Sequence, residues 1–148
     1  MKAQLHSNAL VSFAGEGEQL RLLGDNQTVK LAGSQTGGAF TLIEQNNPPG
    51  VAIPPHFHTQ EDETFYVLEG EMEFTLGEKK IRATAGTTVF LPRGVTHSFK
   101  VMETARALVM TLPSGIENMF RELDALPAEP ADVSQVVSIC KRYGVHFV

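Results

Sequence analysis

The chain has 148 residues, enough for one ordinary domain with a hydrophobic core, and its formal net charge is −5 at pH 7. Lysine and arginine are scattered, with only short pairs at Lys79-Lys80 and Lys141-Arg142, so the sequence offers no basic face for nucleic acid. The single cysteine, Cys140, excludes an internal disulfide, and no apolar run is long enough to span a membrane.

The predicted elements begin with short strands, over residues 20–23, 29–31 and 39–45. Gly24-Asp25-Asn26 and the proline-rich residues 46–50 are predicted turns, and residues 33–38 are a predicted loop. Residues 1–8 lack the apolar core of a secretory signal. Together with the lone cysteine, this predicts a cytoplasmic location.

A histidine pair follows in the stretch from residue 50 to residue 63. Side chains alternate along a strand, so His56 and His58 share one face, with Cα atoms about 7 Å apart. Residues 59–62 are polar and predict a turn, so that Glu63 returns on the neighbouring strand. Two imidazoles and a carboxylate on adjacent strands predict an open metal site.

Two further carboxylates, Glu61 and Asp62, compete with Glu63 for the role of ligand. The alternation favours Glu63, which shares a face with Phe65 and Val67 of the following strand. Asp62 is expected to face away, and Glu61 is expected to lie in the turn.

The central region continues as strands. Residues 63–69 and 71–76 are predicted as two strands broken by Gly70, and Gly77-Glu78 as a two-residue hairpin turn. Further strands are predicted over residues 79–84, 87–91, 95–102 and 104–112. Many short strands with regularly spaced turn signals favour a closed or sandwiched antiparallel structure.

The tail changes to helical spacing. Ser114 and Glu117 form a predicted capping box, and Pro127 and Pro130 end the first helix. Its predicted apolar stripe is Ile116, Met119, Phe120 and Leu123.

A second helix is predicted with Asp132 as its N-cap and Gly144 as its end. Its predicted apolar stripe is Val133, Val136, Val137 and Cys140. Because Cys140 lies on this apolar stripe, it is interpreted as a buried structural thiol and not as a nucleophile.

Two spaced motifs carry a family resemblance. The pattern G-x5-H-x-H-x4-E-x6-G is met at Gly50, His56, His58, Glu63 and Gly70. The pattern G-x5-P-x-G-x2-H is met at Gly86, Pro92, Gly94 and His97, whereas Val101 stands where the pattern would end with Asn. The chain thus resembles the cupin superfamily, in particular its small single-domain, quercetin-dioxygenase-like members.

The resemblance implies a mainly β fold, the double-stranded β-helix or jelly-roll barrel, with C-terminal α-helices. We expect one cupin domain over residues 1–148, with the barrel core at about 36–113 and a helical segment at 114–148. The resemblance also implies one divalent transition-metal ion per chain and a homodimer. The implied metal ligands are His56, His58, Glu63 and His97.

Three imidazoles and one carboxylate would leave one or two coordination positions open on a five- or six-coordinate ion. A structural zinc site closes at four ligands, usually with cysteines, so this ligand set favours exchangeable binding of a small molecule. Mixed nitrogen and oxygen donors suit Fe, Mn, Ni, Cu, Co or Zn alike, and the sequence does not separate these.

The residues expected around the ion are apolar. Barrel interiors are filled by side chains in any case, so each is also explained as core. An apolar wall, with Val101 in place of Asn, favours a largely apolar or aromatic, oxygen-bearing ligand over a small dianion. Arg82, Arg93 and Arg106 are candidate partners for a buried carboxylate, with surface charges as the simpler interpretation. The candidate pocket residues are Phe40, Phe65, Val67, Met72, Phe74, Phe99 and Val101.

Three functions follow as hypotheses. The first is a metal-dependent dioxygenase in which Glu63 also acts as a catalytic base. The second is a metal-dependent isomerase or lyase acting on a sugar or keto acid, with the ion as Lewis acid. The third is a non-catalytic cupin that binds a small molecule. Edge strands and apolar helix stripes are consistent with the expected homodimer.

Overall fold

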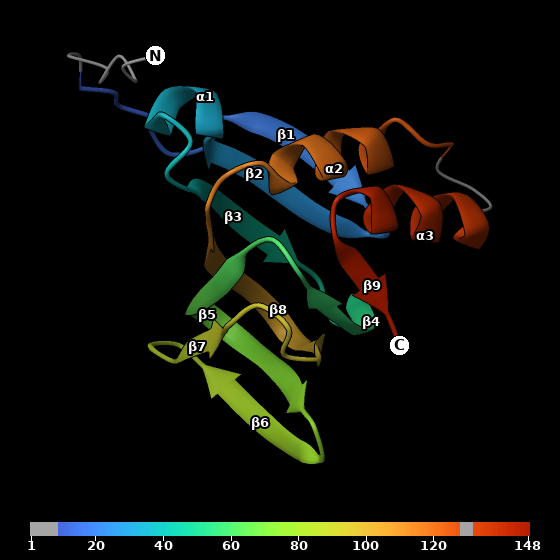
Figure 1. The fold of residues 1–148 in the computed structure, drawn as a ribbon. Helices are drawn as coiled ribbons and strands as arrows, with labels where there is room; N and C mark the ends of the chain where they lie inside the picture. Colours follow the sequence, from blue (N-terminus) through green and yellow to red (C-terminus); the bar gives the residue numbers. More distant parts are fainter. Residues whose placement is uncertain (1–8, 128–131) are drawn as a thin grey trace.

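The computed structural model describes residues 9–127 and 132–148 (Figure 1). Residues 1–8, for which no signal peptide was expected, and Pro130, expected to help end the first helix, lie outside this range. The elements in chain order are β1 (Glu18–Leu22), β2 (Asp25–Leu31), α1 (Gly33–Thr36), β3 (Thr41–Asn47), β4 (Ala52–His58), β5 (Asp62–Leu76), β6 (Lys79–Thr84), β7 (Thr88–Leu91), β8 (His97–Leu112), α2 (Ile116–Asp124), α3 (Val133–Arg142) and β9 (Val145–Phe147).

The strands form one nine-stranded antiparallel sheet that curls around its own inner face (Figure 1). Its main path runs β1-β2-β3-β8-β4-β9, and β5 also pairs with β8 and carries β6 and β7. Buried and exposed residues alternate along most strands, as expected for a sheet with one face in the core. The mainly β fold with C-terminal helices, predicted from the resemblance, is confirmed.

The core lies inside the curl. Phe65, Phe74 and Phe99 are buried there, with ring centroids 5.0 to 6.0 Å apart in edge-on or tilted contacts. Such aromatic pairs stabilise a core beyond the area they bury.

Two predicted strand breaks are absent, because β5 and β8 each run as one long strand. Gly70 was expected to end a strand. Instead it lies in a stretch of β5 where the register against β8 shifts several times, with φ at +80°. A Cβ atom there would collide with the backbone of Thr104 on β8. The glycine therefore permits a bulge that keeps both strands paired.

The N-terminal half differs from the prediction in its boundaries. β2 already begins at Asp25, which was expected in a turn, and β3 continues to Asn47. The side chains of these two residues are buried and hydrogen-bonded to each other. Residues 33–38 contain the one-turn helix α1 where a loop was expected. β9 was not predicted; its three residues pair with β4.

The predicted capping box at Ser114 is wrong, because α2 begins one residue later with Gly115 as its N-cap. The Glu117 carboxylate still accepts a hydrogen bond from the Gly115 amide, at 2.9 Å. It also accepts from the Gly33 amide at 2.7 Å and from the Thr41 hydroxyl at 2.6 Å. One buried carboxylate thus ties α2 to α1 and β3.

The cap of α3 is confirmed, since Asp132 accepts hydrogen bonds from the amides of Ser134 and Gln135. Cys140 is buried as predicted, and burial raises the pKa of its thiol to about 11. The predicted stripe is wrong at Val133 and Val137, which are exposed, because the buried face runs instead through Val136, Ile139 and Cys140. The helices α2 and α3 lie together at one end of the sheet, near β1 and β9 (Figure 1).

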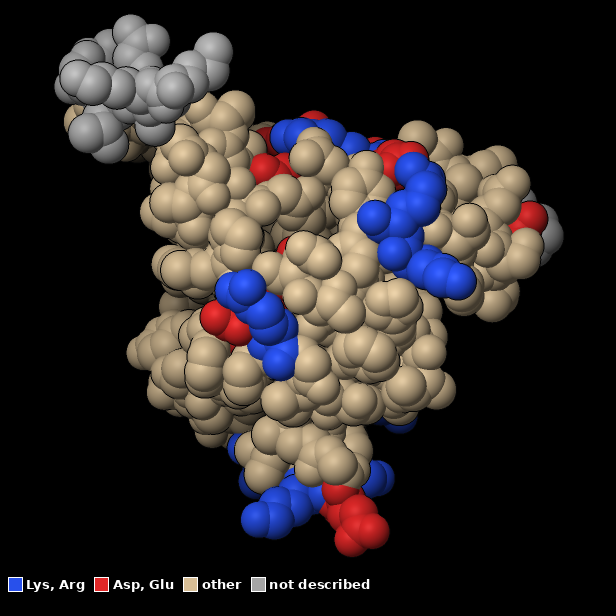
Figure 2. Space-filling view, in the orientation of Figure 1, with Lys and Arg blue, Asp and Glu red and all other residues tan. Residues whose placement is uncertain are grey.

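Charges are mixed on the face seen in Figure 2, where blue and red side chains form small separate groups. The three arginines considered for a buried carboxylate are each paired at the surface with an acidic side chain: Arg82 with Glu71, Arg93 with Asp62, and Arg106 with Glu69 and Glu44. No helix among the described residues is long and apolar enough to cross a membrane.

Candidate metal centre

Three strands bring the four predicted ligands together. His56 and His58 point inward from β4, while Phe57 between them is less buried. His97 opens β8 directly opposite His56, and Glu63 points inward from β5. β4 is irregular where its two prolines precede His56, and its register with β8 shifts there, as expected for residues without an amide donor.

The three histidines face one another inside the sheet. Their ring centroids are 4.3 to 5.6 Å apart, and each offers one nitrogen within 4.8 Å of the other two. All three are buried, at no more than 6% exposure. This close group is compact enough for a single ion.

The Nδ1 atom of each ring lies within hydrogen-bond distance of an acceptor, so each Nδ1 carries the proton. Each Nε2 is then left with its lone pair, as in histidines that bind metals, and those of His58 and His97 lie near the Glu63 carboxylate. The acceptors are the Pro54 carbonyl for His56 (2.8 Å), the Glu61 carboxylate for His58 (3.0 Å) and the Val95 carbonyl for His97 (3.0 Å).

Glu63 completes the group from β5. This strand pairs with β8 and not with β4, so the prediction that Glu63 returns on the strand next to His56 and His58 is wrong. One carboxylate oxygen lies 3.5 Å from His97 Nε2 and the other 3.9 Å from His58 Nε2. Atoms that bind a common ion at about 2.1 Å lie roughly 3 to 4 Å apart. The two Nε2 atoms are buried and form no hydrogen bond with any residue in 9–127 or 132–148. The donor set therefore fits a divalent transition-metal ion.

At two of these residues, His56 and Glu63, the surroundings favour the deprotonated state that binds metal. Burial, aided by nearby His97, lowers the pKa of His56 to about 4, so this imidazole is neutral at pH 7. Burial would raise the pKa of Glu63, but its contact with His97 and the field of His58 outweigh burial and lower it. Burial would lower the pKa of His58, but its hydrogen bond to Glu61 and the charge of Glu63 raise it.

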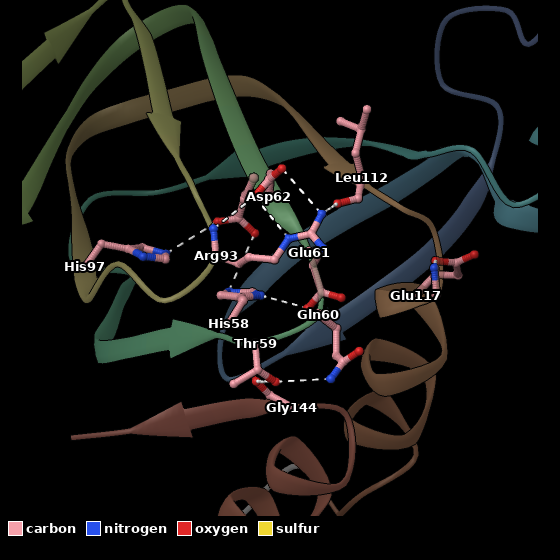
Figure 3. Close-up of polar contacts among 12 residues, drawn as sticks. His58, Thr59, Gln60, Glu61, Asp62, Arg93, His97, Leu112, Glu117 and Gly144 are labelled. Atoms are coloured by element: carbon pink, nitrogen blue, oxygen red, sulfur yellow. Dashed lines mark hydrogen bonds and ion pairs between the residues drawn. The ribbon is translucent and has the colours of Figure 1, made fainter.

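The two competing carboxylates have other partners (Figure 3). Glu61 is buried and accepts the hydrogen bond from His58 Nδ1. Asp62 faces outward, as predicted, and accepts hydrogen bonds from the amide and guanidinium of Arg93. The sequence placed Glu61 in the turn without a role. An acidic residue three positions after a ligand histidine was the available signal.

A cavity of about 60 Å³ adjoins the candidate centre, lined in part by His56, His58 and Glu63. Of the predicted pocket residues, Phe65 and Phe99 line it. Val67, Met72, Phe74 and Val101 are buried in the core but do not line it, and half-buried Phe40 does not reach it.

Residues beyond the barrel motifs complete the apolar wall of the cavity. They could not be found from the motifs, because α2, α3 and β9 fold back over the sheet from the end of the chain. They are Met119, Phe120, Leu123, Cys140, Val145 and Phe147. β9 is held there by pairing with β4 and by the Gly144 carbonyl, which accepts hydrogen bonds from the amide and hydroxyl of Thr59 (Figure 3).

A polar wall was missed altogether. Asp25, Gln27 and Gln45 line the same cavity from β2 and β3. In β2 the signal was the polar run from Asp25 to Thr28, which we interpreted as a turn before a short strand.

Comparisons with known proteins agree with this geometry. Residues 44–113 match the family described as Cupin domain. The chain is 32% identical over 112 residues to quercetin 2,3-dioxygenase from Bacillus subtilis (strain 168), covering 74% of the chain and 33% of that relative. It spans about a third of the length of the curated relatives it matches.

Two solved structures share the fold. KdgF from Halomonas sp. has a TM-score of 0.65 at 17% identity, covering 72% of this chain and 97% of that one. The polyketide cyclase RemF from Streptomyces resistomycificus has a TM-score of 0.62 at 27% identity, covering 71% and 80%. With the two motifs, the curled sheet and the three clustered histidines, these similarities show that the chain belongs to the cupin superfamily.

Proposed function

We propose that the chain is a metal-dependent enzyme in which His56, His58, Glu63 and His97 hold one divalent transition-metal ion. The observation that carries this proposal is the hydrogen bonding of the histidines. Each Nδ1 is held by an acceptor, while the buried Nε2 atoms of His58 and His97 have no donor or acceptor among the described residues. Buried polar atoms without partners are rare unless a ligand or ion satisfies them.

The first candidate reaction is a dioxygenation of a small, largely apolar or aromatic, oxygen-bearing substrate. When bound, the ion supplies Lewis acidity and, if redox-active, electron transfer. Phe65 and Phe99 provide an apolar wall that excludes water from the substrate. Glu63 is placed to accept a proton from a substrate hydroxyl. The similarity to quercetin 2,3-dioxygenase over 74% of the chain supports this candidate.

The second candidate is a Lewis-acid reaction without oxygen, such as an isomerisation, elimination or cyclisation. The polar wall of Asp25, Gln27 and Gln45 favours it, because these side chains can hold a hydroxyl-bearing substrate in one orientation. The 27% identity to a polyketide cyclase also supports it. One fold hosts many chemistries, so the two candidates need a direct test.

The test combines metal reconstitution with oxygen consumption. Protein loaded separately with Fe²⁺, Mn²⁺, Ni²⁺, Cu²⁺, Co²⁺ or Zn²⁺ would be given flavonols, catechols, sugars and keto acids. An oxygen electrode and NMR would be read in parallel. Oxygen uptake that depends on a redox-active metal supports dioxygenation, whereas product formation without oxygen, including with Zn²⁺, supports the Lewis-acid reaction. Saturable binding without turnover would make the chain a binding protein.

We also propose a homodimer formed through the outer face of β5, β7 and β8. Large apolar side chains are exposed there, at 44% for Tyr66, 60% for Phe90 and 41% for Leu112. The strand registers place all three on the same outward side of neighbouring strands. A second copy would cover this face. The cytoplasmic location expected from the sequence stays a prediction.

A further inference from the structure

Four polar side chains lie on the inner faces of β2 and β3, whereas the inner face of the rest of the sheet is mainly apolar. Asp25, Gln27, Gln45 and Asn47 are each at most 5% exposed. Gln27 and Gln45 lie opposite each other in the pairing of the two strands. Polar groups are costly to bury unless something inside the protein uses their hydrogen bonds.

Hydrogen bonds fix the orientation of this cluster. One oxygen of Asp25 accepts from the Asn47 amide group at 2.7 Å, and the other accepts from Gln27 Nε2 at 2.9 Å and Gln45 Nε2 at 3.1 Å. Asn47 is itself held because its side-chain oxygen accepts from the Asn26 backbone at 2.7 Å. Each glutamine therefore turns its NH₂ group toward Asp25 and its oxygen away from it.

The two glutamine oxygens are buried and accept no hydrogen bond from any described residue. Asp25, Gln27 and Gln45 line the cavity that is also lined by His56 and Glu63. Burial raises the pKa of Asp25 although the amide donors oppose it, and the charge of Glu63 adds to the rise. The cluster and the candidate metal centre thus share one cavity and influence each other electrostatically.

We propose that Gln27 and Gln45, oriented by Asp25, form a subsite that accepts hydrogen bonds from a hydroxyl group of the ligand. Two amide oxygens beside a carboxyl group attract donors and repel anions. The ligand is therefore neutral at this end, with a hydroxyl group here and a metal-binding oxygen at the other end. Phe65 and Phe99 would contact the hydrocarbon part between them. This assignment rests on the proposed metal site and specifies the class of its ligand.

The test uses matched ligands on cobalt-loaded protein. Hydroxamates bind metals through one end, and their chain can terminate in either a hydroxyl or a methyl group of similar size. A series of short chains of increasing length would be titrated by calorimetry. At the best length we expect the hydroxyl compound to bind about tenfold more tightly than its methyl counterpart, because the methyl leaves a buried acceptor unpaired. A chain ending in a carboxylate should bind more weakly than either.

Variants then locate the preference. Gln27→Met and Gln45→Met should each abolish the preference for hydroxyl while cobalt stoichiometry stays unchanged. The matched control is Gln19→Met, at an exposed position on β1. If these variants fail to fold, the comparison of hydroxyl and methyl compounds on the wild-type protein is sufficient as the test. Methyl compounds that bind as tightly as hydroxyl compounds in wild type, or a preference kept in both variants, would overturn the subsite. The cobalt absorption spectrum distinguishes a wrong subsite from a wrong metal site. If the metal is open to ligands, simple alkyl hydroxamates must change this spectrum whether or not the hydroxyl subsite exists.

Discussion

At the scale of single residues, the candidate centre depends on the acceptor that receives the hydrogen bond from Nδ1 of each imidazole. Glu61 is buried and accepts the hydrogen bond from His58 Nδ1 at 3.0 Å. We expect Glu61→Ala to weaken metal binding by about 10- to 100-fold, because the imidazole loses its orientation and part of its basicity. Competition with a chromogenic chelator would measure the affinity.

Asp62→Ala is the matched control for this prediction. Asp62 is the adjacent carboxylate, but it faces outward and pairs with Arg93. Equal metal affinities for the two alanine variants would show that Glu61 does not position the ligand.

Sequence spacing predicted which four side chains come together but not what surrounds them. The alternation along β4 and the turn after it were enough to group His56, His58 and Glu63, and the second motif added His97. The inward direction of Asp25 depends on the pairing of β2 with β3, two strands whose ends the sequence did not define. Whether the four side chains bind a metal stays a prediction.

At the scale of secondary-structure elements, Glu117 connects α2 with α1 and β3 through three hydrogen bonds. Its three donors are two backbone amides and a buried hydroxyl. We expect Glu117→Gln to lower the free energy of unfolding at pH 7 by about 1.5–3 kcal/mol, the range for hydrogen bonds to a charged group. Urea unfolding would measure it, with Glu122→Gln on the same helix as the control, since Glu122 is only partly buried and pairs with a single arginine, Arg142.

The same carboxylate predicts a dependence on pH. Burial would raise the pKa of Glu117, but the hydrogen bonds from Thr41, Gly33 and Gly115 outweigh it and lower the pKa below 4.5. A lowered pKa in the folded state means that the stabilisation is complete above 4.5 and is lost as the pH falls through the folded-state pKa. The difference between wild type and Glu117→Gln should therefore shrink below pH 4.5, and a constant difference down to pH 3 would contradict this.

The bulge at Gly70 is a second element-scale prediction. Gly70→Ala combines a positive φ with a collision against the Thr104 backbone, whereas Gly77→Ala combines a similar φ with open space. We expect Gly77→Ala to cost about 1–2 kcal/mol and Gly70→Ala clearly more. Equal changes in the midpoint of urea unfolding would indicate that β5 moves away from β8 without cost.

Local patterns predicted elements well where the periodic pattern of hydrophobic residues extends over many positions. The strands from residue 63 to residue 112 were found, although β5 and β8 were each divided, because a glycine or a polar residue in a paired strand resembles a turn. β9 has three residues, too few for any period, and its pairing with β4 is a tertiary contact. The exposure of Val133 and Val137 likewise depends on how α3 docks.

At the scale of the whole molecule, we expect sedimentation to show a dimer. Phe90→Glu should shift it toward the monomer, because a charge would replace a 60%-exposed aromatic ring within the proposed interface. Phe13→Glu, in the segment before β1, is the control, since Phe13 is exposed at 68%. A monomeric wild type over a wide concentration range would remove the proposed interface.

The sequence predicted the mainly β class and the superfamily, because the regularly spaced strands and the two motifs indicate the same fold. The reaction was not, because it depends on the cavity. Part of its wall comes from β2, β3, α2, α3 and β9, which lie outside the motif region. The sequence predicted an apolar cavity, and the structure adds a polar wall to it.

The metal content of the purified protein shows whether the four side chains bind an ion. Protein produced without added metal and analysed by inductively coupled plasma mass spectrometry should contain close to one divalent transition-metal ion per chain. His56→Ala and His97→Ala should fall to near zero with the fold retained by circular dichroism, whereas His146→Ala, whose ring stacks on Phe57 away from the centre, should keep the metal. Binding should also weaken in acid as the histidines take up protons. Unchanged metal stoichiometry in both His56→Ala and His97→Ala would show that these histidines do not bind the metal.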